Sequence, residues 1–321
     1  IGIDADLNPT RRLFVSAYAA MTQQRGLGDD DATWGGRARW SHPLYRLTWL
    51  HESIGTDYAP ATGFVRRSGV DVDAFGVNFT PEPNLGWVRR FENSVGLILV
   101  DRRRGPLESR YLYVNPILVG PSEQRVGVYW ERDFDRLFGP GFALGDDGTG
   151  APDIVFSGGD YTYDYFGLDL QSDPSHWWVV TFGGLVGEFF DADRTSVTTA
   201  LDLRFAPHVT IGLQTVSERI ERDDETVGIK CFRSDLTRLR VGVDFDTNFG
   251  IDLFAQYDSE DRVALTQLRA HWIFGDESDL YLVFDDARDA DLRVGTRDLR
   301  FDLGDRRRNV WTVKLSYAHQ L

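Results

Sequence analysis

The sequence contains very little cysteine: Cys231 is the only one among 321 residues. One cysteine cannot build an intrachain disulfide framework or a cysteine zinc cluster. This usage fits a cytosolic protein and, equally, a bacterial outer-membrane protein, and we expect Cys231 to be a buried free thiol. The sequence also lacks any run of about twenty apolar residues, which excludes a transmembrane helix. It leaves open a membrane β-barrel, whose strands cross with about ten alternating residues.

Positive charge is scarce as well. The chain has 35 Lys and Arg against 50 Asp and Glu, a formal net charge of −15. A surface that binds phosphates requires a basic face, so nucleic acid is excluded as the main partner. The sequence also lacks the paired histidines of zinc hydrolases and the Gly-x-Ser-x-Gly turn of serine hydrolases. It therefore predicts a protein that is not an enzyme, with no catalytic residue and no cofactor.

What the sequence has in quantity is the composition of a β-protein. Aromatic residues make up 13%, with nine tryptophans, and there are 32 glycines. Apolar and polar residues alternate with a period of two in many segments, most clearly within 237–286, which is the pattern of a strand with two different faces. We count roughly seventeen such strands and no convincing amphipathic helix. Many run for about ten to thirteen residues, against five or six in most soluble sheets.

The predicted connections are of two kinds. Short turns are expected at 207, 247–248 and 275–277, and longer charged loops at 138–159, 218–227 and 287–308. Short turns at one end of the strands and long loops at the other are typical of an outer-membrane barrel. The sequence therefore predicts an all-β fold, an antiparallel transmembrane β-barrel of roughly 16–18 strands that forms a single domain over 1–321. A soluble β-sandwich or propeller is the alternative.

The alternation assigns residues to the two faces of such a barrel. The residues predicted to face lipid are Leu239, Val241, Val243, Phe245, Ile251, Leu253, Trp272, Phe274, Leu315 and Tyr317. The residues predicted to line the lumen are Asp202, Arg204, Arg238, Arg240, Asp244, Asp246, Asp252, Gln256, Arg269, His271 and Lys314. The second set either lines a selective channel or forms a salt-bridge network that braces the barrel, and its mixed sign slightly favours the brace.

Several segments resemble one family of bacterial outer-membrane barrels of unknown function, in which a family-9-like carbohydrate-binding module precedes the barrel. The resemblance is carried by 58–67 (YAPATGFVRR), by 159–161, by 254–259 and 279–284, and by the ending 313–317. It implies an outer-membrane location and a link to carbohydrate handling, and it brings no catalytic residues. In that family further strands come before the point that corresponds to Ile1. We therefore expect a barrel that is N-terminally incomplete relative to the family, as an odd strand number also suggests.

Other candidate sites each have two readings. The acidic loop residues Asp29, Asp30, Asp31, Asp146 and Asp147 either bind Ca²⁺ or are solvated, and the absence of an EF-hand pattern favours the second. The aromatic residues Tyr161, Tyr163, Tyr165, Trp177 and Trp178 either stack on sugars or lie at the membrane interface, which is the favoured reading. The segment 63–67 either folds inward as a plug or gate or is a bend that fixes the strand register.

The function predicted from the sequence is that of a porin-like channel or transport component of the outer membrane. The expected partners are outer-membrane lipid and lipopolysaccharide, small solutes or sugars, and protein partners in a surface or periplasmic assembly. A second hypothesis is a structural anchor or scaffold with a closed lumen. A third is a soluble β-sandwich binding module, which would not partition into detergent.

Overall fold

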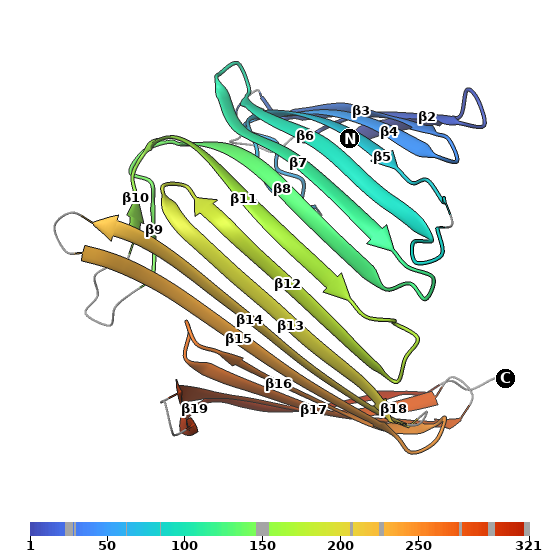
Figure 1. Cartoon of the computed structure of the whole chain (residues 1–321), viewed down its shortest axis with the longest axis vertical. Helices are drawn as coiled ribbons and strands as arrows, with labels where there is room; N and C mark the ends of the chain where they lie inside the picture. Colours follow the sequence, from blue (N-terminus) through green and yellow to red (C-terminus); the bar gives the residue numbers. More distant parts are fainter. Residues whose placement is uncertain are drawn as a thin grey trace.

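The structure is a computed structural model, and it describes residues 1–22, 28, 30–61, 63–83, 85–145, 154–205, 208–224, 228–275, 278–294 and 299–317. Seventeen strands form one antiparallel sheet, and two further strands form a separate hairpin. The all-β class and the strand number confirm the prediction. Figure 1 shows a strongly curved sheet, in which the early strands β2–β5 and the late strands β16–β19 lie at opposite ends of the long axis with β11–β15 between them.

The strands alternate with turns along the whole chain, and most of them are nine residues or longer. In chain order they are β1 (Gly2–Leu7), β2 (Leu13–Met21), β3 (Ala32–Ser41), β4 (Tyr45–Ile54), β5 (Val70–Phe79), β6 (Arg90–Arg102), β7 (Leu107–Val119), β8 (Arg125–Leu137), β9 (Phe142–Leu144), β10 (Ile154–Phe156), β11 (Gly159–Gln171), β12 (Trp178–Phe189), β13 (Ala192–Phe205), β14 (Val209–Asp224), β15 (Gly228–Asp244), β16 (Phe249–Asp258), β17 (Val263–Gly275), β18 (Ser278–Val294) and β19 (Leu299–Ser316).

Each strand of the large sheet pairs with its neighbours in the chain, and β8 pairs directly with β11 across the β9–β10 hairpin. At the two edges, β1 is paired with β2 and β19 with β18. No register joins β1 to β19 within the described residues. The sheet is therefore curved like a barrel wall but open between its first and last strands.

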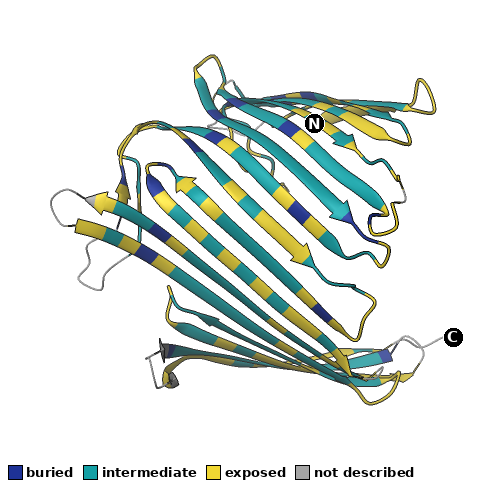
Figure 2. Ribbon diagram, in the orientation of Figure 1, coloured by how far each residue is buried: buried dark blue, intermediate teal, exposed yellow. Residues whose placement is uncertain are grey.

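The two faces of the sheet differ sharply in chemistry. In β13, for example, Val197 and Leu201 point to one side and are exposed, whereas Ser196 and Thr198 point to the other side and are partly covered. Side chains converge on the inside of a curved sheet and diverge on the outside, so we assign the less exposed, polar face as concave. The exposed, apolar face is then convex, and Figure 2 shows exposed and partly covered residues alternating along the strands.

Two of the predicted loops are largely strand. The charged segments 218–227 and 287–308 continue the hairpins β14–β15 and β18–β19, which pair as far as Asp224 with Gly228 and Val294 with Leu299. Cross-strand ion pairs accompany these extensions, such as Arg306 with Asp286 at 3.0 Å. Charge on both faces removes the period of two without preventing a ladder, which is why composition alone mispredicted these segments as loops. The predicted long loop at 138–159 contains the hairpin β9–β10.

The hairpin β9–β10 folds back over the concave face. Ile154 and Phe156 are completely buried there, in a cluster with Tyr163, Phe190, Ala192, Ile220 and Phe232 from the strands beneath. The Phe156 ring lies 5.2 Å from Phe190 and 5.0 Å from Phe142. This cluster is the main buried core of the chain.

Two further features bear on the predictions. Cys231 is a free and exposed cysteine on β15, so the expectation of a buried thiol is wrong. The register places Cys231 opposite Glu221 on the convex side of the β14–β15 extension, whereas Phe232 and Ile220 on the concave side are buried in the aromatic cluster. No helix within the described part of the chain is long and apolar enough to cross a membrane.

Candidate solute-binding site on the concave face

A second segment, 55–69, also folds onto the concave face, and its ends are held together. The Gly69 N–H donates to the Gly55 carbonyl (3.3 Å), and the Arg103 N–H donates to the Gly69 carbonyl (2.9 Å). Gly69 has φ +71°, which favours glycine. A Cβ on Gly55 would lie 2.1 Å from the Asp30 carbonyl oxygen. The segment is thus a closed surface loop with a narrow base.

Asp30 fastens the base of this loop. Its carboxylate accepts hydrogen bonds from the Thr56 N–H (3.0 Å) and hydroxyl (3.2 Å), and it pairs with Arg103 at 3.0 Å. The Thr56 N–H and the Arg103 guanidinium hold the pKa of the Asp30 carboxyl below its usual value. The Asp30 carboxylate is therefore engaged by Thr56 and Arg103, whereas one interpretation of the sequence was that it binds Ca²⁺.

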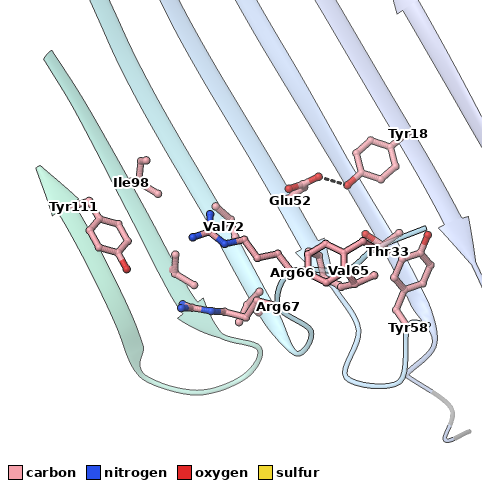
Figure 3. Close-up of a pocket in the computed structure, with 14 residues that line it drawn as sticks. Tyr18, Thr33, Glu52, Tyr58, Val65, Arg66, Arg67, Val72, Ile98 and Tyr111 are labelled. Carbon is pink, nitrogen blue, oxygen red and sulfur yellow. Dashed lines mark hydrogen bonds between the residues drawn. The ribbon is translucent and has the colours of Figure 1, made fainter. Parts of the chain in front are cut away.

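The loop roofs a pocket of about 590 Å³, which is within the range of small-molecule sites. The strands contribute Tyr18, Thr33, Glu52, Ile54, Val70, Val72, Ile98, Val100 and Tyr111, and the loop contributes Tyr58, Phe64, Val65, Arg66 and Arg67. Cross-strand register puts Tyr18, Glu52, Val72 and Val100 on one face. Figure 3 shows the loop side chains lying over these strands.

Most of the charge in the pocket is already engaged. The Tyr18 hydroxyl donates to Glu52 at 2.5 Å, as Figure 3 shows, and Arg67 pairs with Glu108 at 3.4 Å outside the pocket. Arg66 is exposed and has no ion pair among the described residues. Phe64 is 89% exposed at the mouth. The pocket therefore offers one unengaged guanidinium and one uncovered aromatic ring to anything that enters.

The residues predicted to line the lumen do share the concave face, but in another part of the sheet. The cross-strand registers place ten of the eleven on that face: Asp202, Arg204, Arg238, Arg240, Asp244, Asp252, Gln256, Arg269, His271 and Lys314. Several are joined, with Arg269 at 2.7 Å from Asp252 and Arg238 at 3.2 Å from Gln256. None of them lines the pocket under the 55–69 loop.

Asp246 is the exception in that set. It lies in the turn between β15 and β16, where its carboxylate accepts the N–H groups of Asn248 (2.6 Å) and Phe249 (2.8 Å). Asp residues commonly close turns in this way. The alternation was extended two residues past the end of β15 at Asp244, so the prediction of a lumen-lining Asp246 is wrong.

The residues predicted to face lipid lie on or at the ends of the convex face. The cross-strand registers place seven of them on that face: Leu239, Val241, Val243, Ile251, Leu253, Trp272 and Leu315. Phe245 lies just beyond β15 and stacks on Phe249 at 5.2 Å. Phe274 lies 5.5 Å from Trp272 beside an irregularity in the ladder, and Tyr317 follows the end of β19.

The three tyrosines of β11 have neither of the roles weighed for them. Tyr163 is 5% exposed inside the aromatic cluster, and its hydroxyl donates to Asp135 at 2.7 Å. Tyr161 and Tyr165 pack against the same cluster. They therefore hold the β9–β10 hairpin rather than a sugar or a lipid interface. Trp177 and Trp178 are exposed at the opposite end of the sheet.

The structure contains no group of three or more metal-ligating side chains within the residues it describes. The predicted acidic residues Asp29, Asp146 and Asp147 lie outside those residues, as do residue 207 of a predicted turn and residue 276 of another. His51 and His271 each pair with a carboxylate, Asp73 at 3.0 Å and Asp279 at 3.7 Å.

Sequence reasoning did not identify the pocket. Tyr18, Glu52 and Tyr111 are ordinary polar positions of alternating strands, and nothing in a single sequence shows that a loop covers them. The available signal was the segment 63–67, which interrupts the alternation with aromatic and basic residues and for which an inward fold was one of two readings. The structure supports that inward reading.

No family model matches the sequence, and no curated protein matches it. Among solved structures, the chain resembles a mutant of the ferric enterobactin receptor PfeA of Pseudomonas aeruginosa, with 10% identity and a TM-score of 0.49 over 88% of this chain and 58% of that one. It also resembles the siderophore receptor PirA of Acinetobacter baumannii, with 9% identity and a TM-score of 0.40 over 97% and 69%. The chain thus spans less than two thirds of the PfeA length. These resemblances concern the course of the strands and transfer no ligand or role.

Proposed function

We propose that this chain is the membrane-spanning wall of an outer-membrane β-barrel and that its concave face lines a path for small polar solutes. The observation that carries the proposal is the contrast between the faces. Large apolar side chains stay exposed along the convex face from β3 to β19, including Trp49, Phe75, Phe166, Leu201 and Trp311. Water disfavours so large an uncovered apolar surface, whereas hydrocarbon would solvate it.

The free edges of the sheet set a condition on this function. Hydrocarbon does not tolerate unpaired backbone N–H and C=O groups. The edges of β1 and β19 must therefore be covered in the bilayer, by each other or by another polypeptide, before the concave face can enclose a lumen.

The test of the membrane assignment compares two adjacent residues on opposite faces. In a Cys231→Ser background, we expect Leu253→Cys to react with a bilayer-soluble maleimide and Phe254→Cys with a water-soluble one, after reconstitution into liposomes. The register places Leu253 on the convex face and Phe254 on the concave face. Equal labelling of the two cysteines by the water-soluble reagent would reject a membrane-spanning sheet.

The transport part is tested separately. Stepwise conductance in planar bilayers and liposome swelling with small sugars are expected if the lumen is open. Sugars are included because of the resemblance to barrels that follow a carbohydrate-binding module.

The second candidate function is a structural anchor with a closed lumen. The specific observation that favours it is the β9–β10 hairpin, which is packed across the concave face by a buried aromatic cluster. Absence of conductance steps and of swelling, also after residues 58–67 are replaced by a Gly-Ser linker, would support this anchor over the channel.

A further inference from the structure

We infer that the pocket under the 55–69 loop is a binding site for a small anionic aromatic solute, held between Phe64 and Arg66. The inference rests on the proposed function in one respect, since it assumes that solutes reach the concave face. It goes further by naming a site and a chemical class.

The electrostatic argument starts from the charges around the pocket. Glu52 accepts a hydrogen bond from the Tyr18 hydroxyl, and Arg67 is engaged by Glu108 and by the buried Ser109. Arg66 points over Val72 between these two groups, as Figure 3 shows, with no acidic partner in the described chain. An unpaired guanidinium beside apolar side chains binds carboxylate or phosphate groups through paired hydrogen bonds. The site therefore selects an anion.

The apolar argument concerns the ring of Phe64. A phenylalanine that is 89% exposed on a loop whose base is fixed leaves its whole ring in water. Tyr58 and Val65 lie beside it on the same loop, and Ile98 and Val100 form the floor. Aromatic rings gain most by stacking on another flat ring. The pocket volume of about 590 Å³ admits a fused two-ring solute with room for water.

The probes are 2-naphthoate, 2-naphthyl phosphate and neutral 2-naphthol, titrated against the full chain in detergent and followed by naphthalene fluorescence anisotropy. The carboxylate and phosphate probes distinguish the two sources of the anion. We expect at least one anionic probe to bind more tightly than the neutral one.

Three variants locate the site, and two further variants serve as controls. Arg66→Gln is expected to weaken anionic binding at least tenfold and to leave 2-naphthol unchanged. Phe64→Ala is expected to weaken all three probes, and Phe64→Leu to weaken them less. Arg46→Gln and Trp87→Ala remove an exposed arginine and an exposed tryptophan outside the pocket and should change nothing.

Some outcomes overturn the inference. The first is that a folded Arg66→Gln protein binds the anionic probes as tightly as wild type. The second is that Trp87→Ala weakens binding as much as Phe64→Ala does. The third is that the folded wild-type protein binds none of the probes. Folding is checked by heat-modifiable migration on a gel. The titration needs no membrane and no conductance, so the two proposals can fail separately. Probe binding without conductance would reject the channel and leave the binding site standing. Conductance without probe binding would reject the binding site alone.

Discussion

Two segments fold back over the concave face, and they are built in opposite ways. The β9–β10 hairpin buries Phe156 completely among other rings, whereas the 55–69 loop leaves Phe64 almost fully exposed. Arg222 donates to the Val155 carbonyl of the hairpin and pairs with Asp191 in the turn between β12 and β13, but Arg66 has no such partner in the described chain. One segment fills space and the other keeps space open. The contrast separates a hairpin that fills part of the concave side from a loop that covers a pocket.

The largest expected effect comes from the two phenylalanines. Phe156→Ala empties the centre of the aromatic cluster and should lower the free energy of unfolding by about 3–5 kcal/mol. Phe64→Ala removes a ring that contacts mainly solvent and should change it by less than about 0.5 kcal/mol. Urea unfolding in detergent, followed by tryptophan fluorescence, measures both. Comparable losses in the two variants would end the distinction between the segments.

Arg222 and Arg66 should show the same contrast in their effects on the free energy of unfolding, with a smaller difference between them. Arg222→Gln removes one charged hydrogen bond to the hairpin and the ion pair with Asp191, and it is expected to cost about 1.5–3 kcal/mol. Arg66→Gln should be neutral for stability, because no described residue pairs with it. The same unfolding experiment gives both numbers. A destabilised Arg66→Gln protein would show that Arg66 has a structural partner.

The base of the loop provides the next test. Gly55→Ala places a methyl group against the Asp30 and Ala32 carbonyls and should cost about 1–3 kcal/mol. The loop should then open, and trypsin should cleave faster after Arg66 and Arg67. Gly36→Ala is the matched control, since its added Cβ would meet only an ordinary contact at 3.5 Å. Unchanged cleavage in Gly55→Ala would show that the base does not hold the loop.

The smallest effect concerns pH and Asp30. Its pKa is lowered in the folded state, chiefly by the Thr56 N–H, so its contribution is present above the usual value of 3.8 and is lost as pH falls through the folded value. We expect pepsin to cut near Phe64 more slowly in wild type than in Asp30→Asn at pH 5. The difference should be at most about fivefold, as for an exposed ion pair. It should vanish by pH 2, and a difference that persists there would point to a cause other than the carboxylate charge.

Much of the wall could be predicted from the sequence, because burial on one face leaves a period of two. Leu239 and Val241 are separated from Arg238 and Arg240 by that rule alone. It fails where both faces carry charge, as at Arg219 and Arg222 on opposite faces of β14, and the strand extensions were missed there. It also says nothing about where an irregular segment goes. The pocket under Phe64 and the burial of Tyr163 depend on two segments that fold inward, and the alternation of apolar and polar residues in strands does not predict where such segments fold.

The long hairpin β14–β15 makes the rim of the wall uneven. Beyond Leu213 and Leu239 it continues to Asp224 and Gly228, roughly 36 Å at about 3.3 Å per residue, and its last three pairs extend past the end of β13, which pairs with β14 only as far as Glu221. The hairpin β6–β7, near the 55–69 loop, turns at 103–106 soon after its last convex apolar residue, Leu99. A large particle that approaches this rim therefore meets a long hairpin on one flank and a short hairpin on the other. The short hairpin is on the flank where the exposed Phe64 lies.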